Sequence, residues 1–109
     1  MADSDLTWRI LERGESTDYA IFSAHRHRAV HPPSGREGVF TVIDSPNWVN
    51  VIALTPDDEV VMVRQFRHGT ESISLEIPGG LVDPGEAFVE AALRELSEET
   101  GYVAESAEL

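Results

Sequence analysis

The sequence contains no cysteine. Without thiols it can form neither a disulfide framework nor a thiolate metal site, and the absence fits the reducing cytoplasm in which we expect the protein. Basic residues are also few: 8 Lys and Arg stand against 20 Asp and Glu, for a net charge of -12. A chain this acidic does not hold a nucleic-acid backbone, so we expect no nucleic-acid partner. No apolar run approaches the roughly 18 residues of a membrane span, so we expect no membrane partner either.

Repeats and low-complexity tracts are missing as well, and the N-terminal stretch "MADSDLTW" lacks the apolar run of a signal peptide. The 109 residues suit at most one domain, and an apolar content of 41% is enough for a globular core. Strand-like composition is present in several short runs, and two of them, 49–54 and 60–66, are expected to form a β-hairpin. The expected strands are 6–11, 19–30, 39–43, 49–54, 60–66 and 72–77.

One helix is expected late in the chain. Val89, Ala92, Leu93 and Leu96 recur at the spacing of a single apolar stripe. The helix should begin near Glu86, after a turn rich in proline and glycine, and end where a glycine can adopt a left-handed conformation. Many strands followed by one helix are typical of the α+β class.

Acidic residues are concentrated in the last third of the sequence, where residues 71–109 hold ten carboxylates and one base, Arg94. This cluster can be a solubilising face or a site for a divalent cation. Glu95, Glu98 and Glu99 fall within about 100° of one another on a helical wheel, so they share one face. Their mutual repulsion favours a site for Mg²⁺ or Mn²⁺, and Arg94 can orient Glu98 or an acid from the preceding loop.

The same residues carry a resemblance to a known family. The spacing is Gly80, five residues, Glu86, seven residues, Arg94-Glu95-Leu96, one residue, Glu98-Glu99, one residue, Gly101. This pattern resembles the Nudix box, the loop–helix–loop signature of the Nudix hydrolases (MutT-like proteins). Only Tyr102 departs from it, because the family usually has an aliphatic residue there. The upstream segments "DSPNWVNVIALTPDDEVVMVRQFRHG" and "LEIPGGLVDPGE" are similar to the ADP-ribose pyrophosphatase branch.

The resemblance implies a fold and a domain organisation. The expected core, residues 46–109, is part of a Nudix-type α/β/α sandwich with a mixed sheet. Residues 1–45 are expected to form a small antiparallel β subdomain that serves in dimerisation, so the protein would be a homodimer. Family members continue past the box with further strands and a helix. We therefore expect the chain to be truncated there, with the C-terminal part of the core missing.

The resemblance also implies a function. A metal-dependent hydrolase of this kind cleaves the pyrophosphate of a nucleoside diphosphate linked to another moiety, here most simply ADP-ribose to AMP and ribose 5-phosphate. The partner would be a small nucleoside diphosphate sugar, with Mg²⁺ or Mn²⁺ as cofactor. The alternative is a catalytically inactive or truncated Nudix-like module that binds nucleotides or serves in assembly.

Site residues follow from the motif positions that match. The catalytic set would be Glu95, Glu98, Glu99 and Arg94, and the metal ligands would be Glu95, Glu98, Glu99 and the Gly79 carbonyl. The substrate-binding set would be Arg67, Trp48, Glu76 and Gly80. The simpler interpretations are a surface arginine for Arg67, a core tryptophan for Trp48 and a strand-end acid for Glu76.

His25 and His27 lie two residues apart in an expected strand, on one face, and invite a zinc interpretation. Two histidines without further ligands are usually surface residues, and the sequence favours that interpretation.

Overall fold

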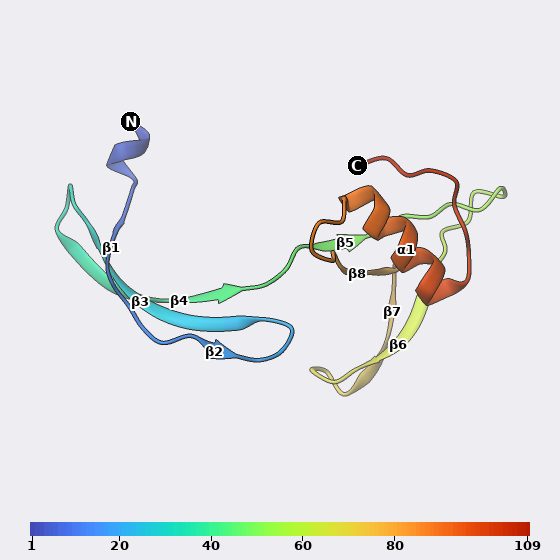
Figure 1. Cartoon of the computed structure of the whole chain (residues 1–109), viewed down its shortest axis with the longest axis horizontal. Helices are drawn as coiled ribbons and strands as arrows, with labels where there is room; N and C mark the ends of the chain where they lie inside the picture. Colours follow the sequence, from blue (N-terminus) through green and yellow to red (C-terminus); the bar gives the residue numbers. More distant parts are fainter. The chain divides into compact units, whose positions relative to one another are not determined.

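The structure, a computed structural model, describes all residues 1–109 and contains two compact units, Met1–Ser45 and Pro46–Leu109 (Figure 1). Strands dominate both units, and α1 is the single α-helix, so the expected α+β class is confirmed. The elements are η1 (Asp3–Asp5), β1 (Arg9–Arg13), β2 (Thr17–Asp18), β3 (Ser23–His31), β4 (Arg36–Asp44), β5 (Trp48–Asn50), β6 (Val63–Arg67), β7 (Ser72–Glu76), β8 (Gly79–Leu81) and α1 (Phe88–Thr100).

The first unit is a four-stranded antiparallel sheet built on β3. Strand β3 pairs along its whole length with β4, from Ser23 opposite Asp44 to His31 opposite Arg36, and Gly35 takes a left-handed φ of 70° in the turn. The other edge of β3 is shared by β1 and β2. Strand β1 begins three residues later than the expected strand at Leu6, because the ladder with β3 starts at Arg9.

Very little apolar surface is buried within the first unit. Ala29 is its one buried hydrophobic residue, at 1% exposure. Tyr19, Ile21, Val39 and Ile43 all remain more than half exposed. A single sheet has no second layer to cover its faces, so the apolar side chains that the strand pattern provides stay accessible.

The second unit packs α1 against β8 and β5. Its buried apolar residues are Val51, Val82, Ala91 and Leu96, and Pro78 is fully buried. Leu96 belongs to the apolar stripe expected from the sequence, and Val89, Ala92 and Leu93 of that stripe are half-buried. The helix therefore uses the predicted face to join the unit, which leaves Glu98 and Glu99 of the acidic face exposed.

Strand pairing in the second unit differs from the expectation. Runs 49–54 and 60–66 pair only near the turn that joins them, through the Leu54–Val60 bridge and a 2.9 Å hydrogen bond from the Val61 amide to the Ala53 carbonyl. Strand β6 forms its ladder with β7, and β5 pairs with β8. Every strand pair is antiparallel, where a mixed sheet was expected. Parallel neighbours need a crossover connection, usually a helix, and here the one α-helix follows the last strand.

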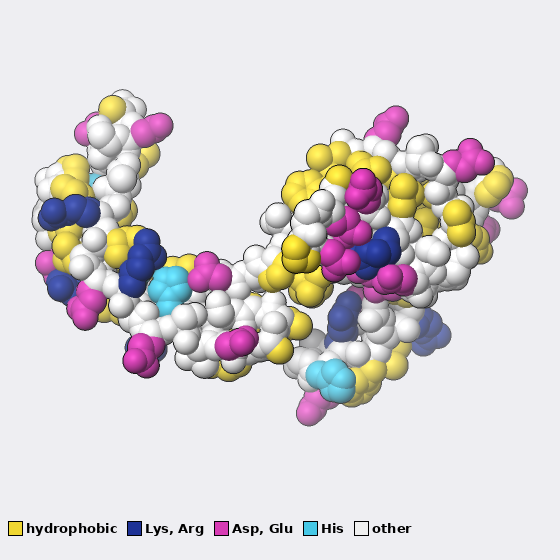
Figure 2. All heavy atoms as spheres, viewed as in Figure 1, with side chains coloured by type: hydrophobic (Ala, Val, Ile, Leu, Met, Phe, Trp, Pro, Cys, Tyr) yellow, Lys and Arg dark blue, Asp and Glu magenta, His cyan; other side chains and the backbone are white.

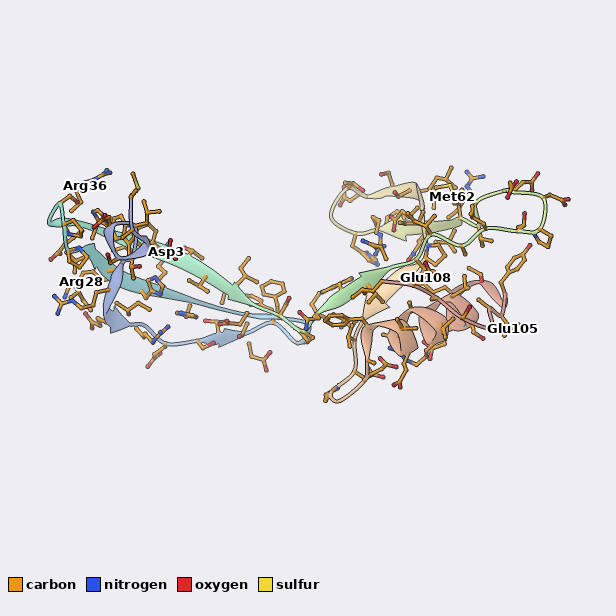
Figure 3. All side chains as sticks on the ribbon, turned by 90° about the horizontal axis from the view of Figure 1, so that it is seen from above. Asp3, Arg28, Arg36, Met62, Glu105 and Glu108 are labelled. Carbon is orange, nitrogen blue, oxygen red and sulfur yellow. The ribbon has the colours of Figure 1, made fainter.

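Helix α1 begins at Phe88, two residues after the start expected at Glu86, because the loop before it forms a turn. The Glu86 amide donates to the Asp83 carbonyl at 3.0 Å, and Gly85 takes a φ of 78°, so residues 83–86 form a turn. The helix ends as expected, with Gly101 at φ 76°. The segment after it, marked by Glu105 and Glu108 in Figure 3, has no regular structure and runs back along α1. No helix has the length and apolar content needed to cross a membrane.

Candidate active site

Acidic side chains gather over α1 in the second unit (Figure 2). A short loop joins β8 to the helix, and the two elements pack against each other, so helix side chains lie beside the β8 backbone. Four of the carboxylates in this region lie within 3.6 Å of one cation, the Arg94 guanidinium: Asp83, Glu86, Glu95 and Glu98. A fifth, Glu99, accepts a hydrogen bond from the Gly79 amide of β8.

Arg94 ties the loop, the helix and β8 together. Its Nε and Nη2 donate to the two oxygens of Glu86 at 2.8 and 2.9 Å, which is the planar, two-bond geometry that only arginine offers. Its Nη1 donates to Glu95 at 3.0 Å and to Glu98 at 3.1 Å, and its Nη2 also donates to the Leu81 carbonyl at 3.0 Å. The contact expected from the i, i+4 spacing is therefore present, together with a contact to an acid of the preceding loop.

Charge pairing shifts the pKa values of both partners in this network. The hydrogen bonds from Arg94, and then the backbone bond from the Asp83 amide, lower the pKa of Glu86 to about 2. The same bonds to Glu86 raise the pKa of the Arg94 guanidinium above its ordinary value. Glu86 is thus ionised throughout the physiological range, and its role is to close the loop onto the helix.

Two glycines of β8 allow the helix carboxylates to approach the backbone. A side chain at Gly80 would place its Cβ 2.4 Å from the Glu95 carboxylate, a distance that real structures do not tolerate. A side chain at Gly79 would meet the Val49 carbonyl at 2.4 Å. The Gly79 amide donates to Glu99 Oε2 at 3.2 Å, so a hydrogen bond links the helix to β8 at this carboxylate.

A second ion pair lies on the β6–β7 hairpin. Arg67 donates through Nε to Glu76 Oε2 at 2.8 Å and through Nη2 to the other Glu76 oxygen. The pair lowers the pKa of Glu76 to about 2, with help from the Ser74 hydroxyl, and raises the pKa of Arg67. Glu99 is close enough to Arg67 to contribute to that increase. The hairpin pair and the helix carboxylates therefore belong to one electrostatic neighbourhood.

Trp48 lies on β5, opposite Leu81 of β8, and is 56% exposed. The structure does not place this ring in the core, which was the simpler interpretation.

Sequence reasoning missed one participant in the site, the Leu81 carbonyl, which accepts a hydrogen bond from Arg94 at 3.0 Å. Asp83, an acid of the loop before the helix, also lies 3.6 Å from Arg94. Strand β8 itself was not expected, because "GGL" has none of the β-branched or aromatic residues that signal a strand.

Comparison with known proteins identifies the family in which this arrangement of loop and helix occurs. Residues 45–109, more than half of the chain, match the NUDIX domain. The chain belongs to the Nudix family. The loop, helix and following glycine at residues 80–101 are its Nudix box, and the resemblance seen in the sequence is confirmed.

Nudix proteins similar to this chain have several functions. The chain is 41% identical over 75 residues to an ADP-ribose pyrophosphatase of Bacillus subtilis, covering 69% of this chain and 40% of the relative. It is 42% identical over 79 residues to a methanol dehydrogenase activator of Bacillus methanolicus, covering 72% and 43%. A crystal structure of an ADP compounds hydrolase superposes with a TM-score of 0.77 at 30% identity, covering 91% of this chain and 54% of that one. The chain thus spans about half the length of these relatives, or less.

The Nudix box offers the donor chemistry that a hard divalent cation requires. Glu95, Glu98 and Glu99 supply carboxylate oxygens, and glycine at position 80 leaves the space beside Glu95. As placed, the acidic side chains form no ready group of three around a common point. Their charge is instead neutralised by Arg94 and the Gly79 amide. A cation would therefore exchange with these contacts, which exposed Glu98 and Glu99 can release by side-chain rotation.

The Glu86–Arg94 pair makes stability depend on pH. The pKa of Glu86 falls from an ordinary value of 4.5 to about 2 on folding, so its ion pair is fully stabilising above about pH 5. That contribution is lost as the pH falls from about 5 towards 2, because the unfolded state takes up a proton at Glu86 over this range while the folded state stays ionised. We expect urea unfolding, followed by circular dichroism, to show Glu86→Gln less stable than wild type at pH 7. The difference should shrink steadily below pH 5, and an unchanged difference at pH 3 would contradict the assignment.

Proposed function

We propose that this Nudix protein is a divalent-cation-dependent hydrolase of nucleoside diphosphate sugars, with ADP-ribose as the representative substrate. The observation that carries the proposal is the placement of Glu95, Glu98 and Glu99 on one helix face beside the β8 backbone, with Glu98 and Glu99 exposed. A pyrophosphate repels nucleophiles because its oxygens are negative, and a bound cation neutralises that charge and lowers the pKa of a water molecule. The cation we propose is Mg²⁺, with Mn²⁺ as its functional substitute.

The residues of this chain have distinct roles in the proposal. Glu95, Glu98 and Glu99 hold the cation with the Gly79 carbonyl, while Arg94 orients the first two through Nη1. Gly80 permits Glu95 to approach the backbone on which the pyrophosphate would rest. Arg67, held by Glu76 across the hairpin, provides a positive group for the phosphates. Trp48 presents an exposed indole beside β8, which suits stacking on a base.

The proposed substrate class is supported by the similar proteins and by the charged residues around the Nudix box. The Bacillus subtilis relative is an ADP-ribose pyrophosphatase, and the similar solved structure is an ADP compounds hydrolase. One arginine offers limited charge for a phosphate chain, which suits a diphosphate better than a triphosphate. Attack of water on one phosphorus of ADP-ribose, with cleavage of the bond from that phosphorus to the bridging oxygen, would yield AMP and ribose 5-phosphate.

A substrate panel tests the proposal. We expect ADP-ribose or another ADP-sugar to be turned over at least about tenfold faster than ATP or dGTP in the presence of Mg²⁺. The panel should be run on this chain and on a hybrid in which residues 46–109 replace the matching part of the Bacillus subtilis pyrophosphatase. If this chain is inactive, an active hybrid would show that the chain lacks surrounding structure. An inactive hybrid would show that the Nudix box itself is defective. Preference for a triphosphate by either protein would overturn the substrate class.

The alternative function is that of a non-catalytic module, and one relative supports it. The activator from Bacillus methanolicus is as similar to this chain as the pyrophosphatase is. A nucleotide-binding or assembly module would bind ADP-ribose without hydrolysing it, even in the hybrid. Phosphorus NMR of ADP-ribose incubated with each protein distinguishes the two functions, because hydrolysis replaces the diphosphate signals with those of phosphomonoesters.

We also propose that the protein forms a homodimer through its first unit. The support is the apolar surface that the single sheet leaves exposed, including Tyr19, Ile21, Val39 and Ile43. Two-fold pairing is the commonest way to cover such a face. Light scattering coupled to size-exclusion chromatography should give about twice the 12.0 kDa chain mass. Replacement of Val39 and Ile43 by glutamate should yield a monomer, and a wild-type monomer at all concentrations would contradict the proposal.

A further inference from the structure

His25 and His27 lie apart from the Nudix box, on β3 of the first unit, and their rings face one another at a centroid distance of 5.8 Å. The sequence favoured the interpretation that both histidines are surface residues, but in the structure both are only partly exposed. The His25 side chain is only 12% exposed. Two ring nitrogens, His25 Nε2 and His27 Nδ1, are buried and have no hydrogen-bond partner in the protein. An unpaired buried polar atom is unfavourable by about 1–3 kcal/mol, so two together call for a ligand.

Asp44 determines which nitrogen of His25 is free. Asp44 Oδ2 lies 3.2 Å from His25 Nδ1, which favours the tautomer that carries its hydrogen on Nδ1. In that tautomer Nε2 is left with a lone pair. A carboxylate that orients one imidazole nitrogen while the other is free is the arrangement found around histidine metal ligands.

The sheet register describes the charges around this pair. Residues directly opposite one another share a face, which places Arg13 opposite His27 on β1 and Phe40 opposite it on β4. At the His25 end, Asp44 and Asp18 both lie opposite Ser23 and so share the same face. Arg36, opposite His31, shares this face as well, so two arginines balance the two carboxylates and the negative charge is confined to the His25 end.

We propose that His25 and His27 bind a divalent transition-metal ion, with Zn²⁺ as the probe, at a site distinct from the Nudix box. The ligands are His25 Nε2 and His27 Nδ1, with Asp44 orienting His25 and water completing the coordination. Zn–N bonds are about 2 Å long, so the two tilted rings would have to turn both nitrogens towards one ion to share it. Imidazole nitrogens prefer zinc, copper and nickel, whereas Mg²⁺ prefers oxygen, so the two sites would select different ions.

The test is a Zn²⁺ titration of the whole chain by calorimetry, with Mg²⁺ in large excess to occupy the box carboxylates. We expect one equivalent to bind, and His25→Ala and His27→Ala each to weaken the affinity at least about tenfold. Asp44→Asn should weaken it about 10–100-fold, as loss of an orienting partner does. The matched control is His31→Ala, because both ring nitrogens of His31 already have partners, Ser34 and the Asp5 carbonyl.

Ring-nitrogen NMR of the wild type keeps the test independent of whether the variants fold. On addition of Zn²⁺, the signals of His25 Nε2 and His27 Nδ1 should shift, while those of His31 and His68 should not. Unshifted His25 and His27 nitrogens would overturn the proposal and indicate that water satisfies them. Equal zinc affinity of folded wild type, His25→Ala and His27→Ala would overturn it as well.

Discussion

Glu99→Gln should remove most of the affinity for Mn²⁺ or Mg²⁺. Glu99 is exposed, and its Oε2 accepts a 3.2 Å hydrogen bond from the Gly79 amide, so it stands beside both the helix carboxylates and the β8 backbone. Glutamine keeps the size and can keep that hydrogen bond, but it removes the negative charge. We expect affinity to fall about 100-fold, the scale on which ligand charge tunes divalent-ion binding. Mn²⁺ binding can be measured by electron paramagnetic resonance and Mg²⁺ binding by calorimetry.

Glu90→Gln is the matched control for this experiment. Glu90 is also an exposed glutamate of α1, but it lies in the first turn and on the opposite side of the helix from Glu95. Its substitution removes the same charge from the chain without removing a proposed ligand. Equal cation binding by wild type and Glu99→Gln would show that the box carboxylates do not hold the ion.

Arg94→Ala should produce the largest loss of stability among the site variants. It removes the hydrogen bonds that join Glu86, Glu95 and Glu98 to one another and to the Leu81 carbonyl. The carboxylates then repel one another without a counterion, and Glu86 and Glu95, at 14% and 13% exposure, are poorly placed to be solvated. We expect the melting temperature to fall by about 5–10 °C, measured by circular dichroism.

Three comparisons make the Arg94 result specific. Arg94→Lys should be intermediate, because lysine keeps the charge but cannot form the two-bond fork to Glu86. Arg64→Ala, which removes an exposed arginine from β6, should change the melting temperature little. Mg²⁺ should recover part of the loss in Arg94→Ala, since a cation can supply the missing positive charge. A melting temperature equal to wild type would show that the network contributes nothing to stability.

The box itself was predictable because its contacts are local in sequence. Arg94 reaches Glu98 one turn later and Glu86 just before the start of the helix, and helical spacing determines which carboxylates share a face. The capping glycine and the apolar stripe follow from the same short-range geometry. Such features depend on neighbouring residues, so the family and the α+β class could be inferred before the fold was known.

The pairing of strands was not predictable in the same way. Alternation indicates that a run is a strand and which of its residues share a face, but it does not name the neighbouring strand. Strand β6 could have paired with residues 49–54 and instead pairs with β7, which follows it after a four-residue turn. The Arg67–Glu76 ion pair exists only because of that pairing.

The sequence by itself therefore determined the Nudix box, its helix, the accessible acidic face and the chemistry of the cation that would suit it. Only the tertiary structure decided what stands opposite that face: β8, whose two glycines admit Glu95 and the β5 backbone at distances no side chain would allow. It also decided the burial of the His25 and His27 nitrogens, which follows from the ladders on both edges of β3. Close approach and burial arise from segments distant in sequence, and such contacts leave no periodic signal in either segment alone.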